Sequence, residues 1–184
     1  MSIQNIEKLL WTQINPVIDA EPNKKQASVM MIIFGEPAKI LMIKKPISMN
    51  YHGGEIAFPG GKISEEDKNL LYTAIRETKE ETGMIIRPEK IIGQLNPVTT
   101  LNSGFTILPF VCVIKKISKL IPNSEVEEFL EIPLIPLLQT LDNDSDPDHR
   151  SIKEMYTFSF EEKIIWGASA RMLKQITEKL DIDN

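Results

Sequence analysis

The stretch that decides the fold is Gly60–Gly83, which reads GGKISEEDKNLLYTAIRETKEETG. It predicts a glycine turn followed by an acidic helix over about Lys68–Thr82. At about 100° per residue, Glu77, Glu80 and Glu81 fall on one face of that helix. Like charges placed so close together repel one another unless a cation lies among them. Hard divalent ions such as Mg²⁺ take carboxylate oxygens together with substrate phosphates, so the segment predicts a metal site for phosphate chemistry.

The alternative is that these glutamates are an ordinary solvated helix face. Three features favour the metal site. The turn Phe58–Gly61 ends in two glycines, which allow the backbone to approach a ligand closely. Arg76 can hold a carboxylate through two parallel hydrogen bonds. Gly83 is placed to end the helix as a C-cap. A second face of the helix carries the residues expected to pack on the core, which are Leu71, Ile75, Thr78 and Thr82.

These residues resemble the signature of the Nudix hydrolase family, G-x5-E-x7-R-E-U-x-E-E-x-G-U, in which U is a bulky apolar residue. Here the tail reads R-E-T-x-E-E-x-G-M and ends at Met84. Thr78 replaces the first apolar residue, and the upstream spacing is one residue longer, with Asp67 in place of a glutamate. The longer form resembles the coenzyme A pyrophosphatase branch. The resemblance begins at about residue 27 and extends through Ser124–Leu134 and Ile164–Leu173.

The resemblance implies an α/β fold, the Nudix-type α/β/α sandwich with a mixed β-sheet between helices. It implies Mg²⁺ or Mn²⁺ as the cofactor, with Glu77 and Glu81 as first ligands and Glu80 next. A carbonyl of Gly60 or Gly61 would complete the metal shell. Two further residues complete the predicted catalytic set, which is Arg76, Glu77, Glu80, Glu81 and Glu125. Arg76 would orient a carboxylate, while the general base is either a glutamate of the helix or Glu125.

The expected activity is metal-dependent cleavage of a pyrophosphate bond in a small-molecule diphosphate. Coenzyme A or a derivative would give 3′,5′-ADP and phosphopantetheine. Alternatives are nucleotide sugars, dinucleoside polyphosphates and NTPs, or a non-catalytic nucleotide-binding module. Relatives of the coenzyme A branch carry two arginines before the turn, and Lys45 and Asn50 stand in their places. Lysine keeps the charge but loses the bidentate geometry, and asparagine loses the charge. The predicted substrate contacts are Lys44, Lys45, Gly60 and Gly61.

Composition limits the other function classes. The chain has 184 residues, 42% of them hydrophobic and 26% charged, as expected for one globular domain with an N-terminal helix and linker over about residues 1–26. A net charge of −5 argues against a nucleic-acid partner or an anionic membrane surface. No apolar run approaches the roughly 20 residues that span a bilayer, so no membrane association and a cytoplasmic location are expected. The N-terminal helix and the C-terminal tail could each be free or cover a homodimer interface.

The remaining pattern predicts alternating strands and helices. Cys112 is expected to be a buried core thiol. Trp166 is interpreted as a core anchor in preference to a platform for base stacking, and Asn123–Leu138 is expected to contain a short helix or turn. Asp142–Asp148 is interpreted as an exposed acidic turn. The expected strands are Ala27–Phe34, Ile40–Lys45, Ile91–Val98, Thr106–Ile114 and a hairpin over Tyr156–Ile165, and the expected helices are Ser2–Trp11 and Gly167–Leu180.

Overall fold

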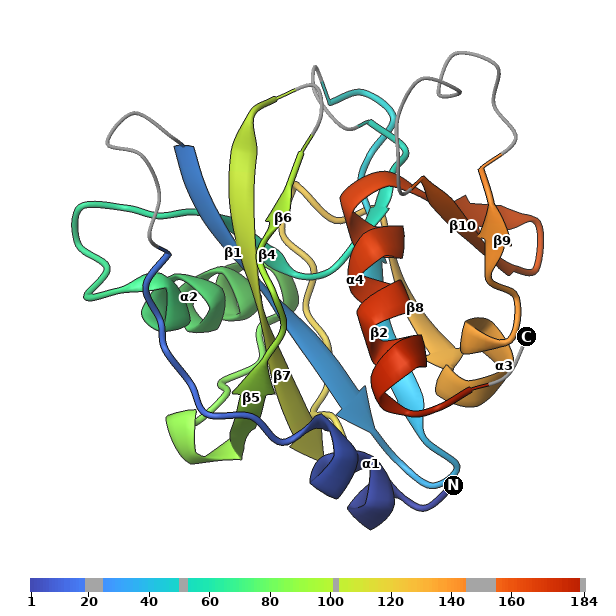
Figure 1. Ribbon diagram of the computed structural model, residues 1–184. Coiled ribbons are helices and arrows are strands. Elements are labelled where there is room, and N and C mark those ends of the chain that lie inside the picture. Colours follow the sequence, from blue (N-terminus) through green and yellow to red (C-terminus); the bar gives the residue numbers. More distant parts are fainter. Residues whose placement is uncertain (19–24, 50–52, 101–102, 145–154, 183–184) are drawn as a thin grey trace.

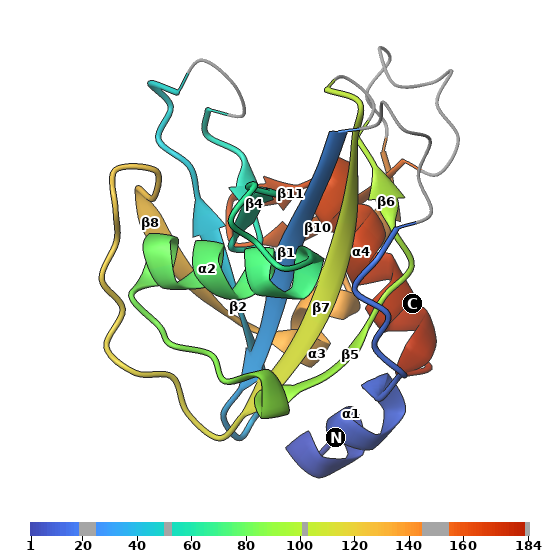
Figure 2. The same cartoon turned by 90° about the vertical axis from the view of Figure 1, so that its left-hand side faces the viewer.

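A mixed β-sheet forms the middle layer of the fold, and helices cover both of its faces (Figure 1 and Figure 2). The computed structural model describes residues 1–18, 25–49, 53–100, 103–144 and 155–182, and the statements below concern these residues. Helix α2 (Leu70–Thr82) lies on one face of the sheet. The helices on the other face are α1 (Ile3–Leu10), α3 (Leu134–Leu138) and α4 (Gly167–Lys179). The expected α/β/α sandwich is confirmed.

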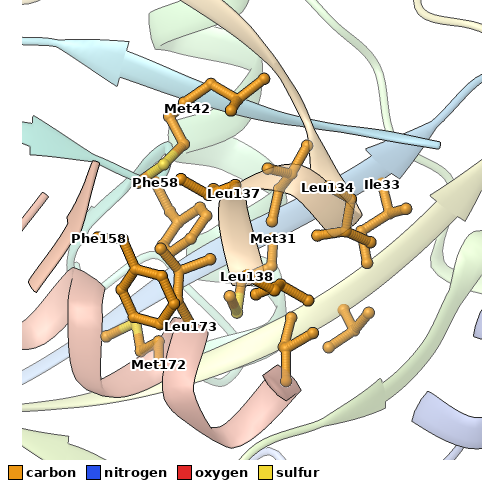
Figure 3. Close-up of a cluster of buried hydrophobic side chains, with 14 of the residues drawn as sticks. Met31, Ile33, Met42, Phe58, Leu134, Leu137, Leu138, Phe158, Met172 and Leu173 are labelled. Atoms are coloured by element: carbon orange, nitrogen blue, oxygen red, sulfur yellow. The ribbon is translucent and has the colours of Figure 1, made fainter. Parts of the chain in front are cut away.

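Two long parallel strands form the centre of the sheet. Strand β1 (Lys25–Phe34) pairs with β7 (Phe105–Ile114) along its whole length. Both strands are near-continuous apolar runs, as expected for strands that are covered on both faces. Alternate residues of β1 point to opposite layers: Met30 packs in the cluster beneath α2, whereas Met31 packs beneath α4. Figure 3 shows Met31 among the apolar side chains of α3 and α4.

One edge of β1 is shared between two strands. Strand β4 (Gly60–Lys62) pairs with the first part of β1 over residues 27–29, and β2 (Lys39–Lys44) pairs with its last part over residues 32–34. Between them, the Met30 amide donates to the carbonyl of Pro59 at 2.8 Å. The glycine turn is thereby inserted into the sheet, next to the centre of the molecule.

The other strands extend the sheet or form a small second sheet. Strand β8 pairs with the outer edge of β2 over six residues, and β9, β10 and β11 form an antiparallel three-stranded sheet beside α4. None of the described helices has the length and apolar character needed to cross a membrane. The bounds of the remaining elements are β3 (Ile56–Ala57), η1 (Pro88–Lys90), β5 (Ile91–Gln94), β6 (Val98–Thr99), β8 (Glu128–Pro133), β9 (Asp142–Asn143), β10 (Tyr156–Phe160) and β11 (Lys163–Ile165).

Two details differ from the sequence-based expectations. The short helix expected within Asn123–Leu138 is present as α3, but strand β8 before it was missed. In β8 the buried Leu130 and Ile132 alternate with the partly buried Phe129 and the exposed Glu131. In α2, Thr78 and Thr82 are fully buried as expected, whereas Leu71 and Ile75 are only partly buried and pack against the cluster that contains Leu70 and Ala74. Most of the acidic turn Asp142–Asp148 lies outside the described residues.

Candidate active site

Arg76 and Asp67 form the anchor of the acidic helix. Arg76 Nε donates to Asp67 Oδ1 at 3.0 Å and Nη2 donates to Oδ2 at 2.9 Å, which is a bidentate pair. Ser64 N–H and the Thr73 hydroxyl also donate to Asp67 Oδ2. The hydrogen bond from Arg76 is the largest cause that lowers the pKa of Asp67 to about 2. The carboxylate that Arg76 holds by two hydrogen bonds is therefore Asp67, the residue that stands in place of a glutamate of the family signature.

The remaining donors of Arg76 connect this anchor to the site. Nη1 donates to Glu77 Oε1 at 2.9 Å and to Glu80 Oε2 at 3.1 Å, while Nη2 also donates to the carbonyl of Lys62 in β4 at 3.1 Å. Glu77 is half-buried, and burial raises its pKa. The side chain of Glu80 is 52% exposed and lies at the rim. Arg76 thus joins the loop, the helix and the glycine strand through one guanidinium group.

Two glycines allow the carboxylates of α2 to lie against β4. A Cβ atom on Gly61 would stand 2.5 Å from Cδ of Glu77, so any larger residue would displace that carboxylate. A Cβ atom on Gly60 would collide with the backbone of Ser28 and Val29 in β1. The amide of Gly60 is left free to donate to Glu81 Oε2 at 2.8 Å. The glycine pair is therefore required by close approach on both sides of the strand.

Glu81 is the most unusual charged group of the site. Its residue is only 1% exposed, and its Oε1 atom accepts no hydrogen bond from any residue that the structure describes. Lys45 Nζ lies 3.7 Å from this oxygen. Burial raises the pKa of Glu81 to about 7, although Lys45 and the Gly60 amide oppose the shift. A buried carboxylate oxygen that accepts no hydrogen bond has the chemistry of a cation ligand.

Lys45 brings a distant loop to the same place. Its Nζ atom also lies 3.9 Å from Oε2 of Glu125, whose side chain is 55% exposed on the loop before β8. The pairing of β2 with β8 brings Glu125 to Lys45, and the Gly60 amide of β4 holds Glu81 from the acidic helix beside them. Lys44 takes a different position: it pairs with Glu127 and is not among the residues that line the described cavity.

A cavity of about 280 Å³ opens on the α4 side of β4. Lys45, Gly60 and Gly61 belong to its wall, so the cavity and the carboxylate site meet along the glycine strand. Phe58, Phe105 and Trp166 also line it. Trp166 is 37% exposed and caps the N-terminus of α4, so its interpretation as a core anchor is wrong. Asn50, Tyr51 and His52 lie outside the described residues.

Comparison with known proteins identifies the family. The model of the NUDIX domain matches residues 24–156. The chain belongs to the Nudix family. This membership confirms the expectation that it is an enzyme of the Nudix pyrophosphohydrolase class.

Three similar proteins illustrate the range of the family. The chain is 27% identical over 164 residues to an uncharacterised Nudix hydrolase, NudL, of Photorhabdus laumondii, with 87% of each protein covered. A MutT/nudix family protein from Enterococcus faecalis superposes with a TM-score of 0.63 at 16% identity, covering 90% of this chain and 65% of that one. A bifunctional NMN adenylyltransferase/ADP ribose pyrophosphatase from Francisella tularensis, complexed with AMP and a manganese ion, has a TM-score of 0.55 at 12% identity, covering 89% and 43%. The two structures show the shared fold.

The donors of the Nudix helix fit an oxygen-liganded divalent ion. Among the residues that the structure describes, no three His, Cys, Asp or Glu side chains stand together as a ready metal site, because Arg76 engages Glu77 and Glu80. The unsatisfied Oε1 of Glu81 and the Glu77 carboxylate beside Gly61 nevertheless supply hard oxygen donors. Mg²⁺ and Mn²⁺ prefer such donors over nitrogen or sulfur. Glu77 and Glu81 are the residues that could hold the ion, with Glu80 farther out.

Proposed function

We propose that this Nudix enzyme hydrolyses the pyrophosphate bond of coenzyme A or its derivatives, giving 3′,5′-ADP and phosphopantetheine. The observation that carries the proposal is the environment of Glu81. A buried carboxylate with an unsatisfied oxygen lies behind a glycine strand, and a cavity lies on the other side of that strand. A diphosphate at this strand would lie beside both the carboxylates and the ammonium group of Lys45.

Each residue has a proposed role in binding or proton transfer. Glu77 and Glu81 hold a divalent ion, Mg²⁺ or Mn²⁺, which when bound neutralises phosphate charge and acidifies a water molecule. Lys45 attracts the diphosphate. Glu125 accepts the proton of the attacking water, because Glu81 is assigned to the ion and Glu125 is the other carboxylate that pairs with Lys45. Arg76 is a positioning residue, since it acts on Glu77 and on the Asp67 loop.

The cavity lining supports a nucleoside-containing substrate. Phe105 and Trp166 supply aromatic surface on which a base can stack, and Lys62 and Arg171 are cationic residues of the same lining. The second candidate is a pyrophosphatase for nucleotide sugars, dinucleoside polyphosphates or NTPs. The absence of an arginine at both Lys45 and Asn50 favours it, because these positions carry arginine in the coenzyme A branch.

A substrate panel tests the proposal. Purified protein with Mg²⁺ or Mn²⁺ is given coenzyme A, acetyl coenzyme A, ADP-ribose, diadenosine tetraphosphate and NTPs, and kcat/KM is measured for each. We expect coenzyme A and its thioester to be preferred, and Glu81→Gln to lose at least 100-fold in kcat, as is typical for loss of an essential charged group. Glu131→Gln, which changes an exposed glutamate on β8, is the matched control.

The outcomes separate the candidates. Preference for ADP-ribose or another diphosphate would favour the second candidate. Tight, metal-dependent binding of a nucleotide that stays intact over hours would favour the non-catalytic module. No turnover of any member, with wild type and Glu81→Gln indistinguishable, would contradict hydrolysis at this site. The proposal takes the cytoplasm as the compartment, and the homodimer stays a prediction that light scattering can test.

A further inference from the structure

Two lysines converge on one aromatic ring at the edge of the cavity. Lys62 Nζ lies 5.3 Å from the centroid of the Phe105 ring, and Lys25 Nζ lies 5.5 Å from it. The sheet register brings them together: Lys25 is the partner of Phe105 across β1 and β7, and Lys62 is the partner of Ala27 across β4 and β1. Lys25, Phe105 and Lys62 are called the two-lysine cluster below.

The charges of this cluster are not neutralised by acidic side chains. Within the described ranges, neither Lys25 nor Lys62 forms an ion pair with a carboxylate, whereas the lysines of β2 and the residue after it all do. The chain as a whole is acidic, with a net charge of −5. Both ammonium groups lie over the same ring, and a cation–π contact is too weak to neutralise their charge. A bound anion would neutralise it.

The position of the cluster relates it to the reaction site. Lys62 directly follows Gly61, which contacts the Glu77 carboxylate, and the carbonyl of Lys62 accepts a hydrogen bond from Arg76. Lys62 and Phe105 both line the cavity that Trp166 also lines. An anion at the cluster would therefore lie near the diphosphate but not on it. A second phosphate on the same nucleotide has this relationship to the diphosphate.

We propose that the two-lysine cluster binds the 3′-phosphate of the adenosine end of the substrate, and so selects coenzyme A over diphosphates that lack this group. The inference rests on the proposed function. Lysines bind a phosphate as point charges and do not need the bidentate geometry of arginine. Lys45 is assigned to the diphosphate and lies between Glu81 and Glu125, so the charge that binds the second phosphate comes from another pair of residues.

Binding of the reaction products tests the cluster without any need for turnover. Calorimetry measures the Kd of 3′,5′-ADP and of AMP, which differ by the 3′-phosphate. We expect the wild type to bind 3′,5′-ADP more tightly, and Lys62→Gln to weaken that binding by about tenfold, as for loss of one charged hydrogen bond, with little change for AMP. Lys25→Gln should act in the same direction, and Lys62→Arg should retain the preference.

The chain offers a matched control for these variants. Lys68 Nζ lies 5.2 Å from the ring centroid of Tyr72, but neither residue lines the cavity. Lys68→Gln should therefore leave both Kd values unchanged. Equal affinity of the wild type for the two nucleotides, or a preference unchanged in the Lys25→Gln/Lys62→Gln double variant, would overturn the proposal.

A second measurement separates this inference from the proposed function. The ratio of kcat/KM for coenzyme A to that for dephospho-coenzyme A should fall about tenfold in Lys62→Gln, again the value expected for one charged hydrogen bond. If both substrates are cleaved but the ratio is unchanged, the cluster does not read the 3′-phosphate and the proposed function stands. If neither is cleaved while the product-binding preference depends on Lys62, the cluster stands and the assigned substrate is wrong.

Discussion

Arg76 and Asp67 are joined by two hydrogen bonds of 3.0 and 2.9 Å, and this pair sets the position of the loop that leads into the acidic helix. The same guanidinium contacts Glu77 and the carbonyl of Lys62. Because three segments of the site meet at one side chain, a small displacement of Arg76 would move the carboxylates and the glycine strand together. A lysine at position 76 could not make these contacts, since it lacks the planar guanidinium group that donates several hydrogen bonds at once.

Asp67→Asn should destabilise the protein and change its response to acid. Loss of the ion pair should cost about 2 kcal/mol in the free energy of unfolding. Because the pKa of Asp67 is lowered to about 2, its contribution is complete above its ordinary value of 3.8 and is lost as the pH falls towards 2. Urea unfolding of both proteins across this range measures the difference. Glu66→Gln, an exposed neighbour, is the control, and an equal loss in that variant would argue against a specific role for the pair.

The metal-free protein should lose stability between pH 4.5 and about 7 because of Glu81. Its pKa is raised in the folded state, so the folded protein keeps a proton that the unfolded chain releases over this range. The free energy of unfolding should fall by up to about 3 kcal/mol and then level off. Urea unfolding in a chelator measures the slope, which Glu81→Gln should remove. A slope that is identical in the two proteins would show that other groups cause it.

Divalent ions should stabilise the protein through Glu81 and the close approach at Gly61. Added Mn²⁺ should raise the melting temperature of the wild type, since a ligand that binds only the folded state stabilises it. Gly61→Ala should reduce this rise, because its Cβ would occupy the place of the Glu77 carboxylate. Differential scanning fluorimetry with and without Mn²⁺ provides the measurement. An unchanged Mn²⁺ response in Gly61→Ala would contradict a role for Glu77 in holding the ion.

Trp166→Ala should weaken substrate binding. Stacking of a base on an aromatic side chain is typically worth about 1–3 kcal/mol, so KM should rise about tenfold while kcat changes less. Steady-state kinetics on the preferred substrate of the panel measures both constants. Trp11→Ala is the matched control, because Trp11 is also exposed but lies beside α1, away from the cavity. A similar rise in KM for the two variants would indicate that Trp166 does not contact the substrate.

Local patterns in the sequence were sufficient to predict much of the fold. The apolar runs that become β1 and β7, the helix that ends at Gly83 and the final hairpin before α4 are present as expected. Strand β8 was missed because Glu128–Pro133 is short and is flanked by prolines and acidic residues. Its partner β2 stabilises it, and pairing between residues about 90 positions apart has no local signal.

The sequence by itself determined the family, the class of enzyme and the residues of the acidic helix, because these depend on spacing along one segment. Only the tertiary structure decided which carboxylate Arg76 grips, that Lys45 meets Glu81 and Glu125, and that Lys44 does not line the cavity. It also decided that Lys25 and Lys62 meet at Phe105. These contacts depend on strand register and on burial, which arise only when distant segments pack together.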